Sequence, residues 1–207
     1  MKFKELLYML GLWLNRIVEL VYESWWTAKK VMRHIDKDFV INNINLKVEY
    51  IKETPREILE ADNPSAGNIP ISGGWGYTQE DCVIINKDDP SVVQSIPFNG
   101  VALEYFFVEK RIYEELIIFR KPGQTFNGIK WEMLEQELIY KNDRQYDHLR
   151  FLIKGHTDKD WDYLNKIFED NNKFIDDPEG FEKHLKENEE LLSCYETDYW
   201  FDITSFN

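Results

Sequence analysis

The chain has little cysteine. Of its 207 residues only Cys82 and Cys194 are cysteines, and they form no CxxC pair. Disulfide-stabilised secreted domains and zinc modules need several closely spaced cysteines, so the sequence argues against both classes. No HxH, HxxxH or HExxH spacing is present either, and we expect no bound metal. We interpret Cys82 as a small core residue because it opens an apolar run.

Long apolar runs are also missing. The longest apolar run near the N-terminus, Leu6–Leu14, has nine residues, whereas a helix needs about 20 to span a bilayer. Asn15-Arg16 follows that run, where a signal peptide would have small residues. We therefore expect no transmembrane segment, a cytoplasmic location and an amphipathic helical segment in residues 1–35. This segment either packs its apolar side in the core or serves as an interaction arm.

Basic residues are outnumbered. The chain has 25 Lys and Arg against 38 Asp and Glu, a net charge of −13. The excess is concentrated in residues 158–202, which carry fifteen Asp and Glu against five Lys. Such acidity repels phosphate backbones and disfavours nucleic-acid binding. It favours association with a protein that has a basic surface; alternatively, it only keeps the protein soluble.

Aromatic residues, by contrast, are abundant: seven Trp, eleven Tyr and thirteen Phe. The composition is typical of a folded globular protein, and no repeat or linker divides it. The sequence predicts a single α+β domain over residues 1–207. Its body, residues 40–207, would hold a mainly antiparallel sheet with two helices near the C-terminus.

Several segments have the alternation or apolar character of strands. The most definite is a hairpin formed by residues 131–140 and 146–154. Residues 101–119 are ambiguous, and we favour a strand, a charged stretch and a second strand over one helix. Further strands are predicted at Leu46–Ile51, Cys82–Ile85 and 199–203.

Helix starts are marked by capping patterns at Thr54, Thr157 and Asp177. The spacing of Asp158, Asp160 and Asp162 is similar to that of a calcium-binding loop, but Tyr163 stands where such a loop needs glycine. We interpret these aspartates as helix-capping and first-turn residues, since acidic side chains complement the helix dipole there.

A glycine-rich segment with aromatic and acidic residues is the most distinctive local feature. Dinucleotide and phosphate loops run from strand through glycines to helix; here the glycines precede a strand, so we expect no nucleotide cofactor. The segment is either a tight structural turn or the rim of a binding site. The candidate residues in it are Gly73, Gly74, Trp75, Gly76, Tyr77, Glu80 and Asp81.

Two functions are consistent with this segment, and the uneven charge together with the absence of catalytic motifs favours the first. In the first, Trp75 and Tyr77 are aromatic anchors of a protein-binding module that masks a basic partner. In the second, the protein is an enzyme or small-ligand-binding protein with a pocket beside the loop. Glu80 or Asp81 would then act as a base or acceptor, with His148 as partner; adjacent strand residues point to opposite faces, so the two carboxylates cannot pair with each other. Glu104 is a more distant candidate partner.

The small size, the acidity, the tryptophan content and the lack of a catalytic signature are similar in general type to many bacterial accessory proteins. These include immunity proteins that neutralise toxins. The similarity is one of type and not of motif, and it implies a protein partner.

Overall fold

The computed structural model describes residues 33–35, 54–62, 69–92 and 98–206. The chain divides into two compact units, which are residues 1–34 with 162–193 and residues 35–161 with 194–207. Most of the predicted N-terminal helix and the predicted strand at Leu46–Ile51 lie outside the described residues. At the end of that predicted helix, Arg33–His34 form the short strand β1 instead, and Arg33 N donates to Leu192 O at 3.0 Å.

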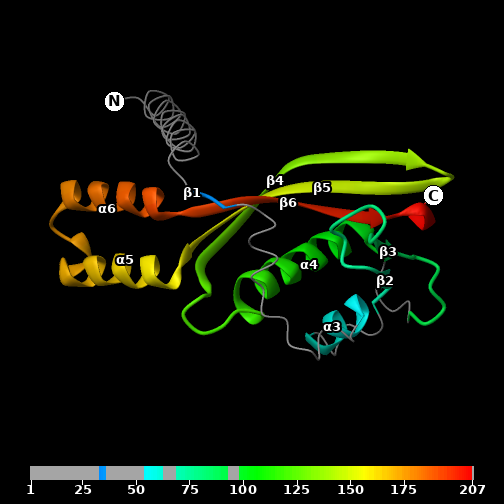
Figure 1. Cartoon of the computed structure of the whole chain (residues 1–207), viewed down its shortest axis with the longest axis horizontal. Coiled ribbons are helices and arrows are strands. Elements are labelled where there is room, and N and C mark those ends of the chain that lie inside the picture. Colours follow the sequence, from blue (N-terminus) through cyan, green and yellow to red (C-terminus); the bar gives the residue numbers. More distant parts are fainter. Residues whose placement is uncertain (1–32, 36–53, 63–68, 93–97, 207) are drawn as a thin grey trace, which may run out of the picture. The chain divides into compact units, whose positions relative to one another are not determined.

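Six strands form one sheet in the order β2-β3-β6-β5-β4, with β1 paired to β6 (Figure 1). The β2–β3 and β4–β5 pairs are antiparallel, and the β3–β6 pair is parallel. The predicted mixture of helices with a mostly antiparallel sheet is confirmed. Beyond β1, the strands are β2 (Ile71–Gly73), β3 (Val83–Ile85), β4 (Phe126–Lys141), β5 (Arg144–Thr157) and β6 (Ser193–Asp202).

The predicted hairpin is confirmed and is longer than predicted. Strands β4 and β5 pair from Phe126↔Thr157 to Lys141↔Arg144. Asn142 and Asp143 form the two-residue turn with φ of 52° and 59°. Asn and Asp tolerate this left-handed region better than other non-glycine residues, and two such residues match the twist of the flanking strands.

The prediction of two strands in residues 101–119 is wrong. The segment forms helix α4 (Gly100–Tyr113), followed by a π-helical turn, Glu114–Ile118. Asn99 caps α4, since its side chain accepts from Ala102 N at 3.1 Å.

The helical spacing of α4 is hard to recognise in the sequence, because charged residues lie among the apolar residues of its buried face. Glu104 and Arg111 are seven residues apart and are both buried, together with Phe107, Val108 and Ile112. A charged residue is almost never fully buried unless it is paired, so the charged stretch Glu109-Lys110-Arg111 favours, from sequence alone, an exposed break between two strands.

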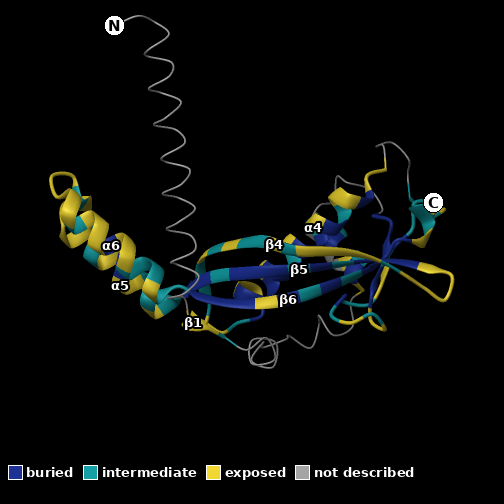
Figure 2. Cartoon of the chain, turned by 90° about the horizontal axis from the view of Figure 1, so that it is seen from above, coloured by how far each residue is buried: buried dark blue, intermediate teal, exposed yellow. Residues whose placement is uncertain are grey.

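The core lies between α4 and one face of the sheet. Phe107 contacts Tyr199 and Phe201 of β6 edge-on, with ring centroids 6.3 and 5.7 Å apart, and Tyr105 contacts Phe151 of β5 in the same way. Figure 2 shows β5 buried along most of its length. Helix α3 (Pro55–Asp62) adds Leu59 to this core.

The predicted start of α3 is also confirmed. Thr54 and Glu57 form a capping box, in which Thr54 N donates to Glu57 Oε2 at 2.7 Å and Glu57 N donates to Thr54 Oγ1 at 3.3 Å. The two backbone donors would otherwise be unpaired at the helix end. A final short 3-10 turn, Thr204–Phe206, follows β6.

Two helices, α5 (Asp158–Asp170) and α6 (Pro178–Leu191), connect β5 to β6. Asp160 N donates to Thr157 Oγ1 at 3.2 Å and Thr157 Oγ1 donates to Asp160 Oδ2 at 2.6 Å, so the predicted cap at Thr157 is confirmed. Asp158 is also in the first turn, but its carboxylate accepts from Thr125 and Asn127 and not from the helix. Asp177 caps α6 by accepting from Gly180 N at 2.9 Å. Within the described ranges, no helix has both the length and the apolar character that crossing a membrane requires.

Candidate functional site

The glycine segment closes a tight loop between β2 and β3. Gly74 N donates to Cys82 O at 3.0 Å, and Gly76 N donates to Asp81 O at 2.7 Å. Gly73 and Gly76 have φ of 85° and 80°, a region that glycine enters at no steric cost. Trp200 N of β6 donates to Gly76 O at 2.7 Å, which ties the loop to the sheet.

Asp81 holds this loop together. Its Oδ2 accepts from Trp75 N at 3.1 Å, and its side chain fills the space beside Gly74, where a Cβ would lie 1.9 Å from Asp81 Oδ1. The carboxylate therefore has a structural role in the loop, whereas Glu80 is exposed.

Trp75 and Tyr77 turn from the loop toward α4. The Arg111 guanidinium lies 4.4 Å from the centroid of the Trp75 ring and 5.4 Å from that of Tyr77. Arg111 Nη2 also donates to the Tyr77 hydroxyl at 2.6 Å, which in turn donates to Glu115. A cation over aromatic faces is stabilised by the ring quadrupoles, more strongly when it is desolvated.

Glu115 is the centre of a buried polar cluster. It is fully buried and accepts hydroxyl hydrogen bonds from Tyr195 at 3.1 Å and Tyr199 at 3.3 Å as well as from Tyr77. The neighbouring Glu114 pairs with Arg111 Nη1 at 2.6 Å. The π-helical turn brings both adjacent carboxylates inside, and such turns are frequent at functional sites.

Burial sets the protonation of this cluster. It raises the pKa values of Tyr77, Tyr195 and Tyr199 well above their usual range, and the charge of Glu115 raises them further. Burial acts to lower the pKa of Arg111, but the acidic groups around it outweigh this and raise the pKa. The phenols are thus held neutral and the guanidinium charged, which favours a permanent structural network over acid–base chemistry.

A second pair of buried carboxyls lies between α4 and β5. Glu104 is 1% exposed and Asp147 5%. Gln136 Nε2 donates to Asp147 Oδ2 at 2.6 Å, but among the described residues neither carboxyl oxygen of Glu104 has a hydrogen-bond partner. Burial, together with the charge of Asp147, raises the pKa of Glu104 to about 8.

His148 is not brought together with Glu80, Asp81 or the Glu115 cluster. Its ring stacks on Trp200 with centroids 4.1 Å apart, and its Nε2 lies 3.1 Å from Asp198 Oδ1. Since neighbouring residues of a strand point to opposite faces, His148 and Trp200 lie on the sheet face opposite Leu149 and Tyr199, which are in the core.

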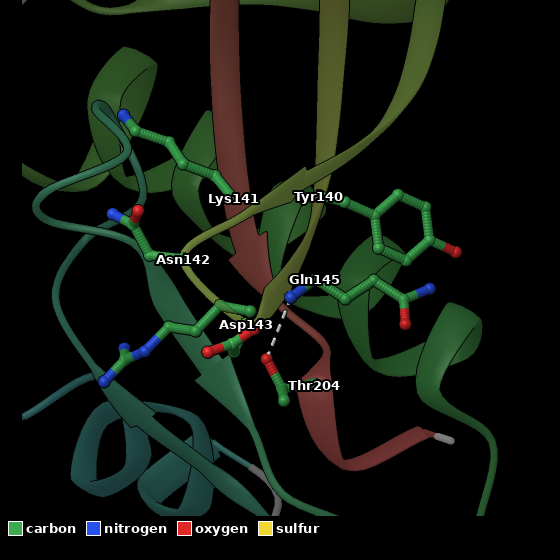
Figure 3. Close-up of a pocket in the computed structure, with 7 residues that line it drawn as sticks. Tyr140, Lys141, Asn142, Asp143, Gln145 and Thr204 are labelled. Carbon is green, nitrogen blue, oxygen red and sulfur yellow. Dashed lines mark hydrogen bonds between the residues drawn. The ribbon is translucent and has the colours of Figure 1, made fainter.

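One hollow of about 370 Å³ surrounds the turn of the β4–β5 hairpin (Figure 3). Gln145 N donates to Thr204 Oγ1 at 3.0 Å across its base. Both cations that line it have partners, since Lys141 Nζ donates to Gln79 Oε1 at 2.7 Å and Arg144 Nη1 lies 3.1 Å from Asp202 Oδ2. The lining residues are Tyr140, Lys141, Asn142, Asp143, Arg144, Gln145 and Thr204.

The predicted acidic region forms much of the surface of α5 and α6. Residues 158–191 carry twelve Asp and Glu against five Lys. Large apolar side chains are exposed among them: Tyr163 is 47% exposed, Ile175 70%, Phe181 39% and Leu185 48%. Exposed apolar groups ringed by charge are a feature of interaction surfaces.

Comparison of the chain with protein-family models, curated proteins and solved structures found no match. The described residues contain no group of three or more His, Cys, Asp or Glu side chains that could hold a metal ion. The sequence had singled out Trp75 and Tyr77, but not their partners Arg111 and Glu115. For Arg111, a signal was its seven-residue spacing from Glu104, which is a helical spacing, although Glu109 and Lys110 lie in the same segment. That spacing does not point to Glu115.

Proposed function

We propose that the protein is a binding module for a protein with a basic surface, and that α5 and α6 form the surface that recognises it. The observation that carries this proposal is the combination of excess acid and exposed apolar side chains on these two helices. Phe181 and Leu185 are one turn apart on α6, so they present one apolar stripe.

The two kinds of side chain would have different roles. The acidic groups attract a basic partner over a distance of about a Debye length and speed the encounter. The apolar groups supply contact area that is buried only in the complex, which lowers the dissociation rate. The pocket hypothesis has less support, because Asp81 is engaged in the loop and His148 lies on the other face of the sheet.

The test is capture of partners on the immobilised full chain from lysate of its source, at about 50 mM and about 500 mM salt, read by mass spectrometry. Wild type should capture a basic protein that is lost at high salt. A variant of α5 and α6, Asp170→Asn with Glu179→Gln and Glu182→Gln, should bind the captured protein about tenfold more weakly, since each exposed ion pair contributes about 0.5 kcal/mol.

The matched control is Asp88→Asn with Glu80→Gln and Glu109→Gln, which makes the same charge change at exposed positions of the other unit. It should bind within about twofold of wild type. Capture that survives high salt, equal weakening by both variants, or no captured protein would each contradict the proposal.

A further inference from the structure

We propose that the outer edge of β4 binds an extended protein segment whose residues alternate between basic and apolar, and that this segment adds a strand to the sheet. The site lies on residues 133–140, in a different unit from most of α5 and α6. It does not require the role proposed for those helices.

The outer edge of β4 is long, and its last seven residues are regular. β4 is the last strand in the sheet order and, among the described residues, pairs only with β5 (Figure 1). Its register is irregular between Asn127 and Lys130 and between Met133 and Glu135, but it continues without a shift from Glu135 to Lys141. An edge strand presents unpaired N–H and C=O groups on its outer side. β2, at the other end of the order, has three residues, so β4 is the edge long enough to pair with a segment.

On the side of the sheet that faces α4, the side chains beside this edge are mostly apolar. Met133, Leu138 and Tyr140 are 41%, 48% and 70% exposed. Tyr105 of α4, itself 39% exposed, contacts Met133, with its hydroxyl 3.4 Å from Sδ. Leu138 is on this same α4 side, since it pairs with Asp147. A strand added here would place every second side chain against these groups.

The opposite face presents two carboxylates at the edge. Glu135 pairs with Arg150 and Glu137 with His148, and both of these β5 residues contact Asp198 on the face away from the core. Glu137 is exposed, and the Glu135 side chain is 59% exposed even though it contacts Arg150. The side chains of an added strand that point to this face would therefore meet carboxylates.

The same acidity excludes a second copy of this chain as the occupant. Antiparallel pairing of two β4 edges about their middle would bring Glu135 and Glu137 of both copies together, and like charges directly opposite are destabilising. Each chain also carries a net charge of −13. A segment with Lys or Arg at alternate positions instead complements the acidic face, while its intervening apolar residues cover Leu138 and Tyr140.

The probe for this site is a fluorescently labelled heptapeptide of alternating lysine and valine, titrated with the full chain and followed by anisotropy. A second peptide of the same sequence is N-methylated at the adjacent residues 3 and 4, which removes one N–H from each edge of the strand while keeping the charge. The parent peptide should bind at least tenfold more tightly than the N-methylated peptide. A glutamate–valine heptapeptide should not bind.

Two substitutions of exposed acidic residues, one at the site and one away from it, test where the peptide binds. Glu137→Lys should weaken binding of the lysine–valine peptide about tenfold, whereas Asp88→Lys, the same charge reversal at an exposed position after β3, should leave it within about twofold. Hydrogen exchange of residues 135–141 should slow when the parent peptide is bound.

Equal binding of the parent and N-methylated peptides would overturn strand addition while leaving the electrostatic attraction of α5 and α6 intact. Self-association of the chain that competes with the peptide would assign the edge to a second copy and would likewise overturn the proposal. Failure of the lysate experiment with normal peptide binding would affect only the role of α5 and α6.

Discussion

Arg111 and Glu115 are charged, yet they lie inside the core, because each side chain of their cluster has partners of complementary charge or polarity. Three phenols donate to Glu115, and Arg111 contacts Glu114, Tyr77 and the face of Trp75. Burying a charge is costly unless it is paired and hydrogen-bonded. Among the described residues, Arg111 Nε and Glu114 Oε1 have no hydrogen-bond partner, but the bonds that are made specify how the glycine loop, the π-helical turn and β6 fit together.

Glu104 differs from this cluster, and its protonation should control stability. Its pKa is raised from 4.5 to about 8 by burial and by Asp147. The unfolded chain therefore releases this proton near its ordinary pKa, whereas the folded chain keeps it until about pH 8. Since the folded state then binds more protons, the free energy of unfolding should fall as pH rises from about 5 to about 8 and level off above that range.

Glu104→Gln should remove most of this slope, because the amide stays neutral at every pH. At pH 9 the variant should be more stable than wild type by a few kcal/mol. Urea unfolding measured at one-unit steps from pH 5 to pH 9 tests this, with the exposed Glu109→Gln on the same helix as control. If Glu104→Gln kept the wild-type slope, the carboxyl would not be protonated in the folded state.

Among the elements, those with local signals could be predicted from the sequence. The hairpin follows from alternation around Asn142-Asp143, and the starts of α3, α5 and α6 follow from caps that act within three residues. Helix α4 could not. Its buried face includes Arg111, whose partner Tyr77 comes from a distant part of the chain, and Glu104, which is buried near Asp147 without a hydrogen-bond partner among the described residues. In α4, contacts with distant parts of the chain outweigh the local sequence pattern.

The glycine loop was predicted as a tight turn or a binding rim, and its packing gives a test of its rigidity. A Cβ at Gly74 would lie 1.9 Å from Asp81 Oδ1 and 2.7 Å from Asp81 O. Gly74→Ala should therefore displace Asp81, break its hydrogen bond from Trp75 N and cost about 2–3 kcal/mol. Gly123→Ala is the comparison, since Gly123 has φ of +81° but nothing within 4 Å, and left-handed strain alone costs about 1 kcal/mol.

Chemical denaturation of both variants measures these costs. Gly74→Ala should be the less stable of the two, and its tryptophan fluorescence should change because Trp75 is held by the displaced side chain. Equal stability of the two variants would mean that the Asp81 side chain can move away from residue 74 at no cost, and that the glycine loop is not rigid.

Across the whole molecule, buried residues are distributed unevenly between the two units. The principal core cluster lies entirely in residues 35–161 with 194–207. Helix α4 has six buried residues, whereas α5 and α6 each have one among the described residues, Leu164 and His184. Since local opening is easiest where few apolar contacts must break, α5 and α6 should open without unfolding of the sheet.

Hydrogen exchange followed by mass spectrometry tests this directly. Amides of α5 and α6 should exchange at least tenfold faster than those of α4 and β5, at a pH where global unfolding is negligible. Binding should hold α5 and α6 closed, so the amide exchange of these helices should slow when a captured basic partner is added, while the exchange of α4 stays unchanged.

Equal protection of α5, α6 and β5 in the free protein would show that both units unfold together. The recognition surface proposed on α5 and α6 would then be a rigid one, and partner binding would leave its exchange almost unchanged.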